Sequence, residues 1–279
     1  MKRTWRNTVV GLSVIAMVAA VFMTAGGAGA QRLGPAGKQS PLANYPRTQT
    51  LITSGSQWGN ITGTNPYVGG AATGTVGLLY ETLLRFDPQK DQYIPWLAQS
   101  ASFVGNKYVI NVRPGVRWTD GKAFTAADVA FNLNLARFNT NPWNNLYLNV
   151  ARVAPAGNKV IVTFKSTPNF VQWQNAMYNM PMVSPTQAKP LITDAAKLTT
   201  YSPANPVGTG PYKIDPAGWD PTTRVVYVKN TNWWAAKLGV SPSPKPKYII
   251  DLVNTSNTNS LSAVLAGVED LNNNYLPGV

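Results

Sequence analysis

The chain has 279 residues, of which 44% are hydrophobic, so it is long enough for one large domain or two smaller ones with buried cores. It contains no cysteine and no histidine, which excludes thiolate nucleophiles, imidazole bases, disulfides and the usual ligands of zinc and haem. Its net charge of +13 comes from basic residues spread singly along the chain, and this arrangement does not favour a nucleic-acid interface.

The first thirty residues have the pattern of a secretory signal peptide. Three basic residues precede a mostly apolar run at 9–23, and the small-residue sequence AGA follows at 28–30. The apolar run of 15 residues is shorter than the roughly 18 residues expected of a membrane-spanning helix. We therefore expect cleavage after Ala30 and export to the periplasm or the cell exterior, without a lipid anchor because no cysteine follows the run.

After a polar lead-in, strand and helix patterns alternate without a fixed repeat, which indicates an α/β or α+β class. Within residues 158–166, Val160, Val162 and Phe164 are expected to face inward. The only two glutamates, Glu81 and Glu269, fall within predicted helices. The predicted strands cover 50–55, 107–113, 158–166, 224–230 and 247–253, and the predicted helices cover 74–87 and 258–271.

The segment 111–133 specifies local geometry in unusual detail. Its Pro-Gly and Asp-Gly pairs, at 114–115 and 120–121, predict tight turns. Thr125 is a suitable helix N-cap, Asp128 completes a capping box, and Phe124 with Val129 occupies the two positions of a hydrophobic staple. Caps of this kind contribute on the order of 1 kcal/mol each and carry no chemistry.

Residues 112–134, "VRPGVRWTDGKAFTAADVAFNLN", resemble the signature of the family 5 extracytoplasmic solute-binding proteins of ABC importers, the dipeptide- and oligopeptide-binding group. Three further segments, at 78–100, 205–214 and 263–271, resemble the same family in the same order. The resemblance therefore spans nearly all of the chain that follows the signal peptide.

This resemblance implies a two-lobed, mixed α/β periplasmic-binding-protein-like fold with an extra inserted domain. Residues 31–76 and 205–279 would form the first domain, 77–204 the inserted second domain, and the chain would be truncated before the third lobe. It also implies a monomeric binding protein, not an enzyme and without a cofactor, that captures a small oligomeric ligand between hinged lobes and delivers it to an ABC permease in the membrane.

The candidate ligand contacts lie in the irregular loop 55–67, which leaves the first predicted strand. Trp58 offers a flat apolar face, while Gln57 and Asn60 offer uncharged donors and acceptors that suit a hydroxyl-rich or amide-rich ligand. Tyr67 in the same loop and Thr209 in the Gly-Thr-Gly turn complete the set. The alternative is that Trp58 packs beneath the loop and the amides cap turns.

Two ligand classes and one enzyme class stay open. Oligopeptide is the commonest assignment in the family, whereas the eight tryptophans of the mature chain and its many asparagines suit β-linked oligosaccharides such as cello-oligosaccharides. Paired carboxylates, for example Asp215 with Asp220, leave a secreted glycoside hydrolase as the rival class.

Overall fold

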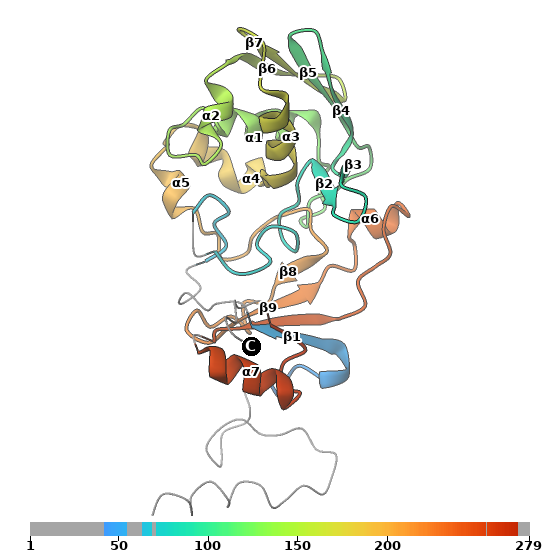
Figure 1. Ribbon diagram of the computed structural model, residues 1–279, viewed down its shortest axis with the longest axis vertical. Coiled ribbons are helices and arrows are strands. Elements are labelled where there is room, and N and C mark those ends of the chain that lie inside the picture. Colours follow the sequence, from blue (N-terminus) through green and yellow to red (C-terminus); the bar gives the residue numbers. More distant parts are fainter. Residues whose placement is uncertain (1–41, 55–62, 69–70, 255, 273–279) are drawn as a thin grey trace, which may run out of the picture. The chain divides into compact units, whose positions relative to one another are not determined.

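This computed structural model describes residues 42–54, 63–68, 71–254 and 256–272. The first of its sheets is built around two central strands in which buried and more exposed residues alternate. In β5 (Lys107–Val112) and β7 (Lys159–Phe164) every second side chain is buried, and Val160, Val162 and Phe164 face inward as predicted. With β4 (Ala98–Val104) and β6 (Val150–Ala156) they form an antiparallel sheet in the order β4-β5-β7-β6 (Figure 1).

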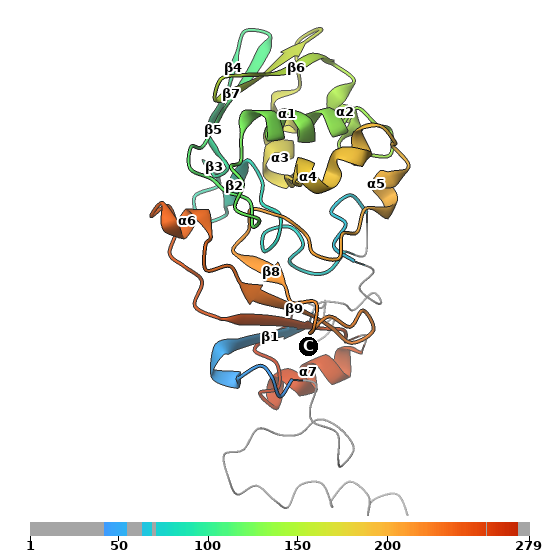
Figure 2. The same ribbon diagram turned by 180° about the vertical axis from the view of Figure 1, so that it is seen from behind.

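The second sheet joins strands that are far apart in the chain. Its order is β11-β1-β10-β9-β8, in which β1 is parallel to both β10 and β11, whereas β9 is antiparallel to β10 and β8. Helix α7 lies against one face of this sheet (Figures 1 and 2). The bounds are β1 Thr50–Ser54, β8 Tyr212–Ile214, β9 Arg224–Lys229, β10 Tyr248–Leu252, α7 Asn257–Leu265 and β11 Leu271–Asn272.

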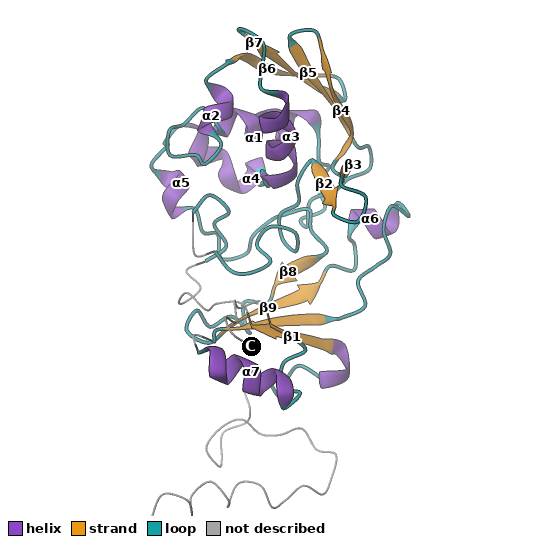
Figure 3. Cartoon of the chain, in the orientation of Figure 1, coloured by secondary structure: helices purple, strands orange, loops and turns teal. Residues whose placement is uncertain are grey.

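Apart from η2, which directly precedes β1, the remaining elements gather beside the first sheet or connect the two sheets (Figure 3). Helix α1 begins with the predicted capping box, because the Thr125 side chain accepts from Asp128 N while the Asp128 side chain accepts from Thr125 N. These elements are η2 Arg47–Gln49, β2 Leu84–Asp87, β3 Gln92–Pro95, α1 Ala126–Leu135, α2 Asn144–Tyr147, α3 Phe170–Asn179, α4 Pro185–Ala188, η3 Lys189–Ile192, α5 Lys197–Thr200 and α6 Trp234–Lys237.

The predicted helix at 74–87 is wrong. Residues 74–80 form tight turns, with Gly74 and Gly77 at φ values of 87° and 103°, and β2 then pairs with β3. The Leu78 and Leu79 carbonyls accept hydrogen bonds from Tyr212 N and Gly210 N, at 3.1 and 2.9 Å, instead of from a following helical turn. The leucine spacing that suggested a helix is therefore satisfied by long-range packing.

The final predicted helix is present but ends earlier than expected. Gly267 adopts a left-handed φ of 68°, and Val268 N donates to Ala263 O while Gly267 N donates to Val264 O, a Schellman arrangement that stops α7. Glu269 therefore lies in the loop after α7 and Glu81 lies in the loop before β2, so neither glutamate is in a helix.

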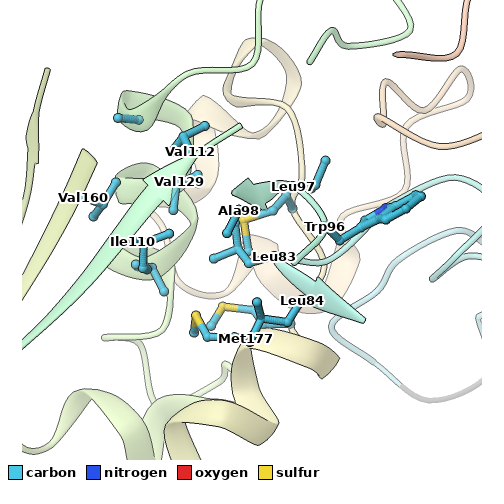
Figure 4. Packing of buried hydrophobic residues seen from close by; sticks show 14 of the residues in the cluster. Leu83, Leu84, Trp96, Leu97, Ala98, Ile110, Val112, Val129, Val160 and Met177 are labelled. Atoms are coloured by element: carbon cyan, nitrogen blue, oxygen red, sulfur yellow. The ribbon is translucent and has the colours of Figure 1, made fainter. Parts of the chain in front are cut away.

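Two hydrophobic clusters lie at the centre of the unit that spans residues 48–279. The larger packs Leu83, Leu97 and Ile110 against α1 and α3, and Trp96 lies at its margin (Figure 4). The smaller surrounds Leu79 and includes side chains of β8 and β9. The separate unit at residues 1–47 is described only from residue 42, where Tyr45 N donates to Leu42 O at 2.9 Å.

The expected signal peptide at 1–30 lies outside the described residues, so its cleavage stays a prediction. Among the described residues, no helix is long and apolar enough to cross a membrane. The second sheet draws β1 and β8–β11 from the two segments assigned to the first domain, and the first sheet lies wholly within 77–204. The boundaries at 76 and 204 themselves stay a prediction.

Candidate ligand-binding site

A cavity of about 370 Å³ opens where the parallel strands end. Its walls come from the segment after β1, the loop before the Gly-Thr-Gly turn, and the connection between β8 and β9. Arg224 at the start of β9 pairs with Leu252 at the end of β10, so this connection lies at the carboxyl edge of β1 and β10. That edge is where ligands bind in open α/β sheets. The lining residues are Gly63, Thr64, Ser202, Pro203, Ala204, Ile214, Pro216, Trp219 and Pro221.

Buried hydroxyl groups lie at this cavity and behind it. Thr64 is only 4% exposed, and its Oγ1 makes no hydrogen bond of ordinary geometry with a described residue, although it lies near enough to the Tyr80 hydroxyl to lower the pKa of Tyr80. The Tyr80 and Tyr201 hydroxyls are likewise buried without a partner of ordinary geometry. All three hydroxyls nevertheless lie close together, because Tyr201 and Thr64 both affect the pKa of Tyr80. Burial raises this pKa most, Tyr201 raises it further, and the Thr64 side chain lowers it. Unpartnered buried hydroxyls are costly in a fold, so groups of this kind mark a place where a ligand or water belongs.

The aromatic wall of the cavity is held by two aspartate turns. Asp215 Oδ1 accepts from Ala217 N at 3.1 Å, and Asp220 Oδ1 accepts from the Thr222 backbone N and hydroxyl at 2.9 and 2.7 Å. These hydrogen bonds from Thr222 lower the pKa of Asp220. Trp219 is thereby fixed between the two turns, partly buried against the smaller hydrophobic cluster. Both aspartates act as turn formers.

The opposite wall depends on a glycine and an asparagine. Gly63 has a φ of 153°, which favours glycine, and a Cβ there would lie 2.5 Å from Ser202 Oγ, so the two segments approach closely at this point. Asn65 then joins them, because its Nδ2 donates to Leu198 O at 2.7 Å and its Oδ1 accepts from Tyr67 N at 2.9 Å. None of the described residues that line the cavity carries a charged side chain. The arrangement suits an uncharged group that presents hydroxyls or amides and a flat face.

The structure describes two of the five predicted ligand contacts. Gln57, Trp58 and Asn60 lie outside the described residues. Tyr67 is 5% exposed and packs edge-on against Trp143, with ring centres 6.4 Å apart. Thr209 is fully buried beside Glu81. Both have clear packing roles, and their contact with a ligand stays a prediction.

Sequence reasoning missed the cavity residues that the fold brings together. Thr64 lies inside the predicted binding loop but is not among the predicted ligand contacts, because nothing in the sequence shows whether a threonine hydroxyl finds a hydrogen-bonding partner. Trp219 and Ser202 lie in separate segments that only the fold joins. The Asp-x-x-Gly-Trp-Asp pattern at 215–220 could have indicated a tryptophan held between turns.

A second buried polar group, also missed, is the Glu81 cluster, which we define as Glu81, Trp96, Trp233, Trp234 and Thr209. Three indole N–H groups donate to the Glu81 carboxylate: Trp96 and Trp233 to Oε1, at 2.9 and 3.3 Å, and Trp234 to Oε2, at 2.7 Å. Burial raises the pKa of Glu81 to about 7, and the hydrogen bonds from the indoles oppose that rise. The cluster is closed, whereas the cavity is open. Among the described residues, no group of three or more acidic side chains could hold a metal ion.

A family model for the bacterial extracellular solute-binding proteins, family 5 (middle), matches residues 92–278. The chain belongs to this family. It is 32% identical over 169 residues to the glutathione-binding protein GsiB of Pectobacterium atrosepticum, covering 57% of this chain and 30% of that protein. It is 28% identical over 162 residues to the peptidoglycan-binding protein YepA of Agrobacterium fabrum, covering 56% and 25%.

Solved structures confirm the mixed α/β periplasmic-binding-protein fold. A periplasmic oligopeptide-binding protein of an ABC transporter from Thermotoga maritima, with mannohexaose bound, is 31% identical with a TM-score of 0.76, covering 84% of this chain and 43% of that chain. The oligopeptide-binding protein AppA of Bacillus subtilis, in complex with a nonapeptide, is 20% identical with a TM-score of 0.66 and supports the fold alone. The chain spans less than half the length of these relatives.

Proposed function

We propose that this chain is the solute-capturing part of an extracytoplasmic binding component of an ABC import system, which holds a small oligomeric solute and delivers it to a membrane permease. The single observation that carries the proposal is the uncharged cavity at the carboxyl edge of β1, with the buried, unpartnered Thr64 hydroxyl in its wall. Family membership supports the same role.

Two ligand classes are proposed, one from the family and one from the residues that line the cavity. Oligopeptide comes first from the family, since relatives named for oligopeptides and glutathione are among those that match. β-Linked oligosaccharide is the second candidate, because Trp219 supplies a face for a sugar ring and no described lining side chain is charged to pair with a peptide terminus. Binding, not hydrolysis, is proposed for both classes, because Asp215 and Asp220 are occupied as turn formers.

Saturation-transfer NMR on the exported chain tests this proposal, since it detects ligands that bind as weakly as millimolar. Di- to pentapeptides and cello-oligosaccharides are compared on the wild type, Thr64→Val and Trp219→Ala, with Phe170→Ala, on the exposed face of α3, as the control. We expect one ligand set to bind the wild type and Phe170→Ala, and to bind both cavity variants more weakly. Equal binding by all four proteins would contradict the assignment of the cavity.

The remaining expectations are part of the same proposal. The protein is exported, works as a monomer with one permease partner, and has no nucleic-acid partner. Trp58, which is not among the described residues, is proposed to stack on the ligand. Trp58→Ala is therefore expected to weaken binding by roughly 1–3 kcal/mol with little change in melting temperature. A large fall in melting temperature would instead make Trp58 a core residue.

A further inference from the structure

A second cavity, of about 180 Å³, lies between α2 and α3, among the helices beside the first sheet (Figure 3). It has no lining residue in common with the cavity at the carboxyl edge of β1, and none of its described lining residues is charged. Trp143 and four primary amides contribute to its walls. The amides are Asn145 of α2 and Gln172, Asn175 and Asn179 of α3. We call this cavity the amide pocket, and nothing in the proposed binding function uses it.

The three amides of α3 share one face of the helix. Their spacing of three, four and seven residues places Gln172, Asn175 and Asn179 one above another on that face. The opposite face is buried in the larger hydrophobic cluster through Trp173 and Met177. The core therefore fixes the direction in which the three amides point.

The other wall is held by a turn at the start of α2. Asn141 Oδ1 accepts from Trp143 N at 2.9 Å, and Asn144 Nδ2 donates to Ala136 O at 3.1 Å. These bonds tie the segment that carries Trp143 and Asn145 to the end of α1. Both walls are therefore formed without a ligand, which lowers the cost of ordering side chains when a ligand binds.

Much of the hydrogen-bonding capacity of the four amides is unused. The Asn145 and Gln172 side chains make no hydrogen bond with a described residue. Asn175 Oδ1 accepts from the Tyr93 hydroxyl, which leaves the Asn175 NH₂ group, and Asn179 Nδ2 donates to Asn175 O at 2.9 Å, which leaves the Asn179 carbonyl oxygen. The pocket thus presents both NH₂ donors and carbonyl acceptors, close together and uncharged.

A sugar unit matches this set better than a peptide does. Each sugar hydroxyl both donates and accepts, so neighbouring hydroxyls can bond to an NH₂ group and to a carbonyl oxygen, while the apolar face of the ring lies against Trp143. The walls come from helices and offer no strand edge on which an extended peptide could pair. The volume is also below the roughly 300–1,000 Å³ of pockets for drug-sized ligands, which suits one small unit.

We propose that the amide pocket is a second binding site, which takes one neutral sugar unit of a saccharide through its hydroxyl groups, with Trp143 against the apolar face of the ring. The site belongs to the inserted region of the chain and does not depend on the cavity at the carboxyl edge of β1.

Side-chain amide NMR tests the site directly. The NH₂ signals of the ¹⁵N-labelled exported chain are followed during titration with cellobiose, mannobiose and diacetylchitobiose to high millimolar concentrations. The signals of Asn145 and Gln172 are assigned by their loss in Asn145→Ala and Gln172→Ala. We expect at least one sugar to shift both signals in the wild type until they saturate.

The two variants then measure the contribution of each wall. Each should bind that sugar roughly tenfold more weakly, as observed through the remaining signal, because one or two hydrogen bonds are lost. Gln174→Ala is the matched control, since Gln174 is exposed on the same helix and does not line the pocket, so it should bind as the wild type does. All three replaced residues are exposed, so all three variants should keep the wild-type melting temperature.

Trp219→Ala separates this site from the proposed function. The Gln172 shift should persist in Trp219→Ala, whether or not the cavity at the carboxyl edge of β1 binds a ligand. The absence of a saturable shift with all three sugars would overturn the proposal. Equal affinities for Asn145→Ala, Gln172→Ala and Gln174→Ala would overturn it as well.

Discussion

The Glu81 carboxylate and the hydroxyl groups at the cavity are both buried and polar, yet they differ in whether their hydrogen bonds are made. Glu81 receives three indole donors, whereas Thr64, Tyr80 and Tyr201 have no partners of ordinary geometry. A satisfied buried group stabilises one arrangement of the chain, while an unsatisfied one costs stability until something binds it. The Glu81 cluster therefore contributes to the stability of the fold, whereas we expect the hydroxyls at the cavity to form their hydrogen bonds with a ligand.

Replacing one tryptophan in each region should break the comparison most visibly. Trp234→Ala removes a side chain that is 2% exposed and leaves Glu81 Oε2 without its donor, so we expect the free energy of unfolding to fall by about 3–5 kcal/mol. Trp219→Ala, at a partly buried ring, should cost only about 1 kcal/mol of stability while weakening ligand binding. Denaturant unfolding of both variants checks this, and equal losses would refute the distinction.

The backbone side of the cluster should be almost as sensitive. A methyl group at Gly210 would lie 2.0 Å from Leu78 O and disturb the hydrogen bond from Gly210 N to Leu79 O, so Gly210→Ala should cost about 3 kcal/mol. Gly121→Ala is the control, because its φ of 87° is strained for alanine but its Cβ would meet no atom within 4 Å. The control should cost about 1–2 kcal/mol. A smaller loss for Gly210→Ala than for Gly121→Ala would show that the turn is not tightly packed.

Two threonines sharpen the comparison at the scale of one hydroxyl. Thr53→Val removes the donor to Asp251 Oδ1, at 2.6 Å, and should destabilise the protein by about 1–3 kcal/mol. Thr64→Val removes a hydroxyl that makes no hydrogen bond of ordinary geometry, although it lies near the Tyr80 hydroxyl, and should change stability by less than about 1 kcal/mol. Thermal unfolding in the absence of ligand measures both. A larger loss of stability in Thr64→Val would mean that its hydroxyl has a partner in the fold.

Local patterns predicted local structure well. Alternation gave β5 and β7, and the capping box placed the start of α1, because each depends on residues that are neighbours in sequence. The helix predicted at 74–87 is wrong because the carbonyls of Leu78, Leu79 and Glu81 accept hydrogen bonds from residues more than a hundred positions away. Glu81 was misread with it, since no local pattern indicates that three distant indoles converge on one carboxylate.

The cavity was predicted only at one wall. The sequence indicated the loop after β1, which contributes Gly63 and Thr64, but not the wall from 202–221. That wall lies beside the loop because β1 pairs with β10, 198 residues further along the chain, and β10 pairs with β9. Alternation of buried residues within one strand cannot specify such a pairing. The Gly63 contact with Ser202 is of the same kind.

The most direct test of the account follows the eight tryptophan indole N–H signals of the mature chain in a ¹⁵N NMR titration with peptides and cello-oligosaccharides. Single Trp→Phe variants assign Trp219 and the three indoles of the Glu81 cluster. At constant pH, we predict that the ligand that binds shifts the Trp219 signal and leaves Trp96, Trp233 and Trp234 in place. Shifts in the three cluster signals with Trp219 unmoved would contradict the division between a binding cavity and the structural Glu81 cluster.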